Sequence, residues 1–139
     1  MLVLDTNVIS EVLRPEPDAR VEAWLKALPP ASVFTTAVSR AEILYGIAIL
    51  PKGRRHSALL TAAVLMFDED FQGRVLPFDS EAATLYANLA SARRQKGHPI
   101  SFADAQIAAI TLSRGGRLAT RNVSDFAECG IDLVNPWAT

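Results

Sequence analysis

The stretch Leu2-Val3-Leu4-Asp5-Thr6-Asn7 indicates the fold that we expect for this chain. A short apolar run followed by turn and helix-capping residues is typical of a buried strand that leads directly into a helix. The same pattern recurs, and further strands are expected at 32–36, 74–78, 118–120 and 132–134. Helical segments separate these strands, which is the pattern of a parallel sheet with helices on both faces. The sequence therefore predicts an α/β fold in three layers.

Capping residues and chain breakers predict where the helices begin and end. The first helix follows residues 5–7, the second begins after Asp18, and prolines end both. The remaining helices are expected at 39–50, 55–67, 79–96 and 101–114. Asp79 and Ser101 are the predicted caps of the last two.

The composition limits the class of protein. The chain has 139 residues, half of them hydrophobic, and a net charge of −1. This length suits a single domain covering residues 1–139. No apolar run approaches the ~20 residues of a membrane helix, and the first residues lack the basic start of a signal peptide. The single cysteine, Cys129, excludes an internal disulfide. We therefore expect a soluble, cytoplasmic domain with no membrane segment.

Four carboxylates stand where the apolar pattern has no place for a charge: Asp5, Glu42, Asp104 and Asp125. Asp5 ends the first strand, whereas Glu42 and Asp104 lie in otherwise apolar helices. Structural interpretations also exist: Asp5 as a helix cap, Ser39–Glu42 and Ser101–Asp104 as capping boxes, and Asp125 as the start of a short helical turn.

The predicted topology gathers these acids. The carboxyl ends of parallel strands open on one edge of a sheet, where ligands bind in such folds. Carboxylates gathered there repel one another unless a cation lies among them or they take up protons. Oxygen ligands without paired Cys or His suit Mg²⁺ or Mn²⁺ rather than zinc. Such an ion activates water against a phosphodiester without a nucleophilic side chain. His56, His98 and Cys129 are expected to be surface or structural residues.

The charge pattern outside the four acids is mildly basic. Basic residues bunch at 52–55, 93–96 and 114–121, and without the four acids the remaining charges total +3. A basic rim around an acidic hole suits a polyanionic substrate. The alternative is that these clusters are solvated helix ends. The glycine-rich loops that bind nucleotide phosphates are absent from the sequence.

Four motifs, taken in order, resemble those of PIN domains: residues 4–10 (LDTNVIS), 39–46 (SRAEILYG), 100–109 (ISFADAQIAA) and 119–126 (ATRNVSDF). The likeness spans nearly the whole chain and is greatest to the VapC-type toxins of bacterial toxin–antitoxin pairs, particularly the FitB-like branch. It implies a five-stranded parallel sheet and Mg²⁺- or Mn²⁺-dependent cleavage of RNA. It also implies a homodimer that a small antitoxin holds inactive, for which the helices after Asp18 and over 55–67 are candidate interfaces.

The resemblance also assigns roles to single residues. Asp5, Glu42 and Asp104 would form the core of the metal site. The fourth position is open, because some relatives carry an aspartate where Asn122 stands, so that either Asp125 or the neutral Asn122 would complete the site. Thr6 and Asn7 would support the first carboxylate, Thr120 would support the fourth motif, and Arg121 would hold substrate phosphates or be an ordinary surface arginine.

Two other functions remain compatible with the residues. The first is a catalytically silent module of the same fold that acts only through protein contacts, which the neutral Asn122 keeps open. The second is a haloacid-dehalogenase-like phosphatase, which also has an aspartate after its first strand. That family has a second aspartate two residues later, where this chain has Asn7.

Overall fold

The strands of the computed structural model, which describes residues 1–138, form one parallel sheet in the order β3-β2-β1-β4-β5. Their bounds are Leu2–Leu4 (β1), Val33–Thr36 (β2), Val75–Leu76 (β3), Arg117–Ala119 (β4) and Asp132–Val134 (β5). The edge strand β3 is shorter than the expected 74–78, because Pro77 has no amide to donate to a neighbouring strand. The five predicted strands and their parallel pairing are confirmed.

Six α-helices connect these strands: α1 (Thr6–Val12), α2 (Ala19–Lys26), α3 (Ala37–Ala48), α4 (Arg54–Leu65), α5 (Ser80–Gln95) and α6 (Phe102–Ser113). Short 3-10 turns lie at Pro30–Ser32 (η1), Val123–Phe126 (η3) and Pro136–Ala138 (η4), and a π-helical turn, Met66–Asp70 (η2), extends α4. Helix α3 begins two residues earlier than predicted, because the side chain of Thr36, the last residue of β2, caps it.

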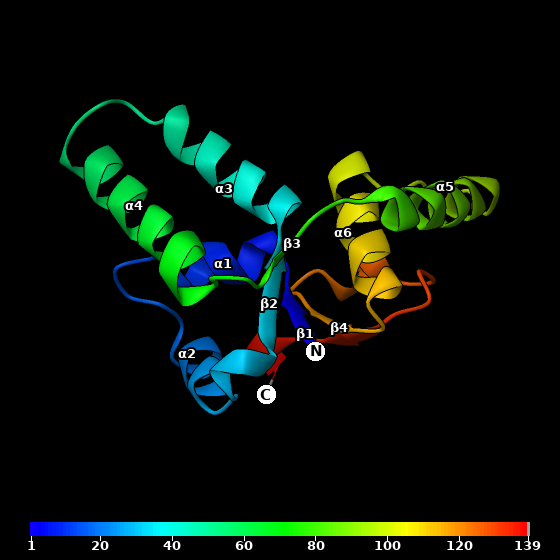
Figure 1. The fold of residues 1–139 in the computed structure, drawn as a ribbon, viewed down its shortest axis with the longest axis horizontal. Helices are drawn as coiled ribbons and strands as arrows, with labels where there is room; N and C mark the ends of the chain where they lie inside the picture. The colour runs from blue at the N-terminus through cyan, green and yellow to red at the C-terminus, as the bar shows by residue number, and fades with distance from the viewer. Residues whose placement is uncertain (139) are drawn as a thin grey trace.

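The sheet has one hydrophobic core on each face, which confirms the three layers. Leu2 and Leu4 of β1 contribute to a core shared with α1, α2, α3 and α4, whereas Val3 between them contributes to the core under α5 and α6. This alternation is the one that a strand covered on both faces requires. Trp24 of α2 packs against the first core. Figure 1 shows α3 and α4 on one side of the sheet and α5 and α6 on the other.

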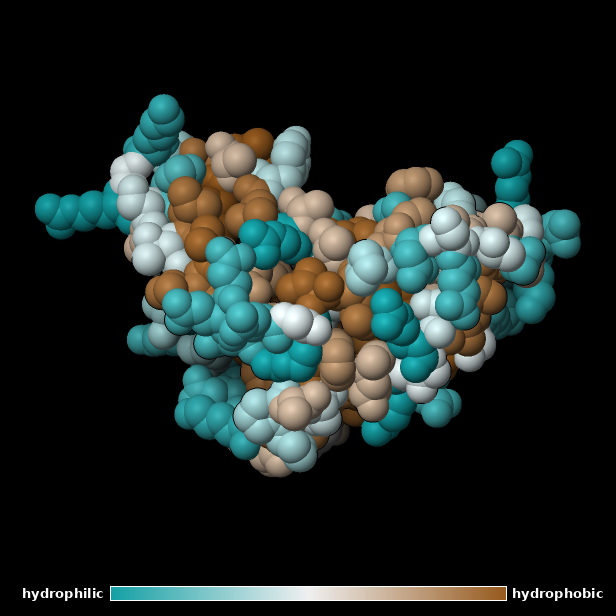
Figure 2. All heavy atoms as spheres, in the orientation of Figure 1, coloured by the Kyte–Doolittle hydropathy of each residue, from teal (hydrophilic) through white to brown (hydrophobic). Residues whose placement is uncertain are grey.

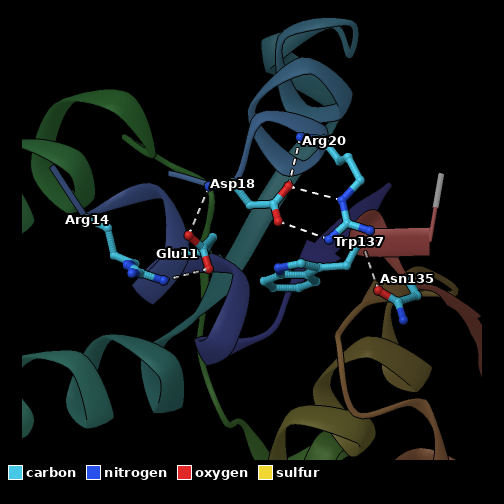
Figure 3. Close-up of polar contacts among 6 residues, drawn as sticks. All are labelled: Glu11, Arg14, Asp18, Arg20, Asn135 and Trp137. Atoms are coloured by element: carbon cyan, nitrogen blue, oxygen red, sulfur yellow. Dashed lines mark hydrogen bonds and ion pairs between the residues drawn. The ribbon is translucent and has the colours of Figure 1, made fainter. Parts of the chain in front are cut away.

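The loop between α1 and α2 is fixed by a small polar network (Figure 3). The buried Glu11 accepts a hydrogen bond from the Asp18 amide at 3.0 Å and lies 3.5 Å from the Arg14 guanidinium. Asp18 caps α2 as predicted, and its ion pair with Arg20 holds the pKa of its carboxyl below the ordinary value. Among residues 1–138, no helix has both the length and the apolar character needed to span a membrane.

The strands are added to the two sides of β1 in turn, so the strand order of the sheet reverses at β1. From this strand the chain moves outward through β2 to β3, and it later returns to the other side to form β4 and β5. In open parallel sheets, the crevice outside the carboxyl ends of the strands at such a switch point is where ligands bind. Of the four predicted acids, Asp5, Glu42 and Asp125 follow β1, β2 and β4, the three strands at this point, whereas Asp104 lies in α6, the helix before β4.

Candidate functional site

Asp5 lies at the carboxyl end of β1 and is the most firmly held of the candidate acids. One carboxylate oxygen accepts the Thr6 amide at 2.8 Å, which makes Asp5 the cap of α1. The other oxygen accepts the Thr120 hydroxyl, also at 2.8 Å, and the Asp5 amide donates to Ala119. Only 4% of the residue is exposed. Asp5 is therefore fixed by both β1 and β4.

The environment of Asp5 favours its protonated form. Burial raises the pKa of the carboxyl from 3.8 to about 6, although the hydrogen bonds from Thr120 and Thr6 oppose the shift. The charges of Asp104 and Glu42 raise this pKa further. Carboxylates affect one another in this way only when little water separates them. The three acids from three separate motifs are thus electrostatically coupled.

Glu42 lies in the second turn of α3 and does not form the capping box with Ser39 that its spacing suggested. Thr36 caps this helix by accepting the Ser39 amide at 3.0 Å, so Ser39 is already inside the helix. Glu42 instead accepts the Thr6 hydroxyl at 2.6 Å, and the Thr6 and Ser39 hydroxyls lie 2.9 Å apart. The start of α1 is therefore joined to the exposed carboxylate of α3.

Asp104 lies in the first turn of α6 and is partly buried. Ser101 caps this helix as predicted, since its hydroxyl accepts the Asp104 amide at 3.2 Å. Burial raises the pKa of the Asp104 carboxyl, and the charges of Asp125 and Glu42 add to that effect against the hydrogen bond from Ser101. Asp104 is thus coupled to the first two acids and to the fourth motif.

Asp5, Glu42 and Asp104 line one cleft with a volume of about 990 Å³. Figure 2 shows the surface hollowed between the lobe of α3 and α4 and the lobe of α5 and α6. Two of the predicted supporting residues, Thr6 and Asn7, also line the cleft, together with Arg121 and Asn122 of the fourth motif. Away from the acids, the cleft has apolar walls from α3, α4 and the segments that follow α1 and α3: Leu13, Pro15, Ile47, Leu50, Leu59 and Ala62.

The fourth motif is divided between two hollows. Asn122 lines the large cleft, whereas Asp125 is exposed on η3 and faces a smaller cavity of about 200 Å³ that it shares with Asp104. Asp125 starts no helix but lies within the 3-10 turn, where its amide donates to Asn122. The structure therefore brings the neutral Asn122 to the main cleft, and it places the charged Asp125 behind Asp104.

A polar network joins the first motif to the fourth. The Asn7 side-chain amide donates to the Thr120 hydroxyl and its oxygen accepts the Arg121 amide, both at 3.3 Å. Thr120, which is fully buried, also accepts the Asn122 amide at 3.1 Å. Thr120 thus contacts both the first carboxylate and the fourth motif, while the Thr6 side chain contacts Glu42 rather than Asp5. The Arg121 guanidinium lies over the Trp137 ring at 5.1 Å.

The donor set at the cleft suits a hard divalent cation, although its members are not in contact. Within residues 1–138, no three Asp, Glu, His or Cys side chains stand close enough to hold a metal ion as they lie. The carboxylates nevertheless face one cleft and raise one another's pKa, and a cation among them would relieve that repulsion. Only oxygen donors are present, as Mg²⁺ and Mn²⁺ prefer.

Three residues near the site were missed in the sequence. Ser39 fits the pattern of a cap, although it is a buried partner of Thr6. Trp137 carries no signal in the sequence, because its contact with Arg121 joins distant parts of the chain. Arg93 belongs to a basic cluster in the sequence, yet it lies four residues after the buried Leu89 on α5 and is itself buried. That helical spacing is the signal that would have identified it.

These features define an α/β protein with an acidic cleft at the carboxyl edge of a parallel sheet. The family model of the PIN domain matches residues 2–130, and the chain belongs to this family. The resemblance drawn from the four motifs is therefore confirmed.

Relatives match nearly the full length of the chain. It is 39% identical over 137 residues to "VapC ribonuclease Y4jK" of Sinorhizobium fredii, covering 99% of this chain and 98% of that protein. It is equally similar to "Toxin FitB" of Neisseria gonorrhoeae, over 140 residues and 99% of each chain. A solved structure of FitAB bound to an IR36 DNA fragment matches with a TM-score of 0.92 and 39% identity, covering 99% of this chain and 96% of that one. The FitAcB structure from Neisseria gonorrhoeae matches at 0.88 and 36%, covering both chains fully.

Proposed function

We propose that this protein is the toxin of a type II toxin–antitoxin pair and acts in the cytoplasm as an endoribonuclease that depends on Mg²⁺ or Mn²⁺. The names of the full-length relatives support the reaction class. The observation that carries the proposal is the position of Asp5, Glu42 and Asp104 around one cleft, although they come from three distant motifs. No side-chain nucleophile is needed for this chemistry.

The cation would be held by Asp5, Glu42 and Asp104, with Asn122 or Asp125 as a fourth partner. When bound, such an ion polarises the phosphodiester and lowers the pKa of a water molecule. The protein's own residues keep the carboxylates in place: Thr120 holds Asp5 from β4, and Thr6 holds Glu42 from α1.

The cations around the cleft are suited to bind the RNA backbone. Arg14, Arg55 and Arg121 line it, and guanidinium groups bind phosphate oxygens with good geometry. Arg121 is placed over the Trp137 ring next to Asn122. We assign it the role of holding a phosphate beside the acids.

The apolar half of the cleft is where we place the antitoxin. The two solved structures named above, FitAB and FitAcB, are complexes. In this chain, Leu13, Ile47 and Leu59 give the cleft an apolar wall that runs on from the acids. A partner segment lying there would cover the acids and block access of RNA to them.

We also propose that the protein forms a homodimer. The exposed Leu60 and Val64 of α4 offer apolar surface for the interface. Light scattering measures the oligomeric state directly.

Cleavage of structured RNA by the toxin purified free of its partner tests the proposal. We expect cleavage with Mn²⁺ that stops with chelator and is lost in Asp5→Asn. The control variant Glu69→Gln removes an exposed carboxylate outside the cleft and should cleave like the wild type. Cleavage that survives both chelator and Asp5→Asn would contradict the mechanism.

The catalytically silent module remains the second candidate. Two observations favour it: the residue of the fourth motif at the cleft is the neutral Asn122, and within residues 1–138 no three acidic side chains lie close enough together to hold a metal ion. Calorimetry with Mn²⁺ separates the two functions, because a silent module has no reason to bind the ion at millimolar concentration, whereas the nuclease binds it.

A further inference from the structure

Arg93 of α5 is a buried charge that the proposed reaction does not use. Only 7% of it is exposed, and among residues 1–138 no carboxylate forms an ion pair with it. Removing an arginine from water is costly unless its donors are satisfied. Here its donors are satisfied mainly by main-chain carbonyl groups. The role of the Arg93 side chain therefore depends on the segments to which those carbonyl groups belong.

Its acceptors belong to two different loops. The Arg93 Nε donates to the His98 carbonyl at 2.7 Å, in the loop that leads into α6. The Nη1 donates to the carbonyls of Asp125 at 2.9 Å and Ala127 at 2.8 Å, at the end of η3, and lies 3.6 Å from the Cys129 sulfur. One guanidinium group therefore joins the loop before α6 to the loop after β4.

The first of these loops is held through both main-chain polar groups of His98. The His98 amide donates to the Arg93 carbonyl at 3.0 Å, and the Gly97 amide donates to Arg94, also at 3.0 Å. Gly97 has a φ of 78°, the left-handed conformation that closes a helix in this way. The backbone and the side chain of Arg93 thus hold the same residue, His98, by its amide and its carbonyl, and the path to Ser101 begins from that fixed point.

Each of the two loops positions one acid of the site. Ser101, three residues after His98, caps the helix that carries Asp104. The other loop carries Asp125 itself. Arg93, Ser101, Asp104 and Asp125 all line the small cavity behind the main cleft. The planar fork of arginine reaches both loops at once, which the single nitrogen of lysine does not.

We propose that Arg93 is a positioning residue that sets the separation between Asp104 and the fourth motif, and thereby the affinity of the site for its cation. This inference rests on the proposed function, because it assumes that a divalent ion binds at these carboxylates. Arg93 touches neither the ion nor the RNA. Outer groups that orient ligands typically affect metal affinity or activity by about 10- to 100-fold.

The test compares Arg93→Gln and Arg93→Lys with Arg94→Gln, which removes the same charge from an exposed neighbour on the same helix. We expect both Arg93 variants to unfold cooperatively but to bind Mn²⁺ about 10- to 100-fold more weakly by calorimetry. Amide exchange of Asp125 and Ala127 should become faster. In RNA cleavage, kcat at fixed Mn²⁺ should fall with KM unchanged, and saturating Mn²⁺ should restore it. Arg94→Gln should match the wild type in all four measurements.

Each other outcome is decisive. A folded Arg93→Gln with wild-type Mn²⁺ affinity and wild-type exchange would overturn the proposal. So would Arg93→Lys behaving like the wild type, because the charge alone would then suffice. If both variants fail to fold, the residue supports the whole domain rather than the spacing of two loops, and the proposal is wrong. If the wild type itself neither binds Mn²⁺ nor cleaves RNA, the proposed function fails. The amide-exchange data still test whether Arg93 holds the two loops together.

Discussion

The first and fourth motifs bring their polar groups to the same region in very different ways. Asp5 is 4% exposed, and both of its oxygens accept hydrogen bonds from neighbouring elements. Asp125 and Asn122 are exposed on a 3-10 turn and face two different hollows. A buried strand end fixes a carboxylate before any ligand arrives, whereas a turn held mainly through its backbone leaves its side chains free to adjust. We therefore expect the first motif to define the site and the fourth to adjust its affinity for the cation.

The largest expected effect comes from removing the buried acid. Asp5→Asn should lower kcat/KM for RNA cleavage by about 10²- to 10³-fold or more, because it removes a carboxylate that would hold the cation, and the cation is what would stabilise the developing negative charge. Asp125→Asn should lower it only by about tenfold, since that carboxylate does not line the main cleft and shares only the smaller cavity with Asp104. Equal losses in single-turnover assays of the two variants would break the distinction between the motifs.

The burial of Asp5 should also make the free energy of unfolding of the metal-free protein depend on pH. Because the pKa of Asp5 rises from 3.8 to about 6 on folding, the folded state takes up a proton between these values, and its free energy of unfolding rises as the pH falls through 6. Above pH 6 the ionised carboxylate destabilises the fold by about 3 kcal/mol.

Urea unfolding of the wild type and Asp5→Asn in chelator measures this effect. The free energy of unfolding of the wild type minus that of the variant should increase by about 2 kcal/mol from pH 8 to pH 4, with the remainder recovered only below the unfolded-state pKa of 3.8. Glu69→Gln serves as the control for loss of an exposed charge. A difference between wild type and Asp5→Asn that does not change with pH would show that Asp5 is not desolvated.

The hydroxyl that joins the two motifs gives the next effect. Thr120 donates to Asp5 and accepts from Asn7 and Asn122, so Thr120→Val should weaken Mn²⁺ binding by about 10- to 100-fold. Thr120→Ser keeps the hydroxyl and should retain most of the affinity. If calorimetry gives Thr120→Val the same affinity as Thr120→Ser, the hydrogen bond to Asp5 is not needed to orient it.

The smallest effect is a gain. Asn122→Asp places a fourth carboxylate on the main cleft and should tighten Mn²⁺ binding a few-fold, with a small loss of metal-free stability from added repulsion. The comparison is with Ser124→Asp, which adds the same charge on the same exposed turn outside the two hollows. Tighter binding in both variants would mean that general charge, rather than the position of Asn122, is responsible.

Much of the fold was predictable because it depends on local chemistry. Asp18, Asp79 and Ser101 cap helices at the predicted positions, since a short polar side chain before an apolar periodic run has few other roles. The cap of α3 was misplaced because Thr36 and Ser39 both fit the pattern. Which of them acts depends on where β2 leaves the sheet, and that is set by pairing with β1 and β3 rather than by the local sequence.

The candidate site was predictable only in outline. A parallel sheet brings the ends of β1, β2 and β4 to one edge, which predicts that Asp5, Glu42 and Asp125 gather there and that Asp104 joins them if the start of its helix points to the same edge. In the structure Asp5, Glu42 and Asp104 share the main cleft, whereas Asp125 does not line it. The contacts of Thr6 with Glu42 and of Thr120 with Asp5 join residues 36 and 115 positions apart, respectively. The first contact depends on how α1 and α3 dock and the second on the register between β1 and β4, which no local pattern specifies.

The most direct test of the account is the anomalous diffraction of crystals soaked in Mn²⁺. We predict an anomalous peak from Mn²⁺ within the main cleft, with Asp5, Glu42 and Asp104 as the protein ligands of the ion. A crystal that shows no peak at these carboxylates at saturating Mn²⁺, or a peak bound only by other side chains, would contradict it.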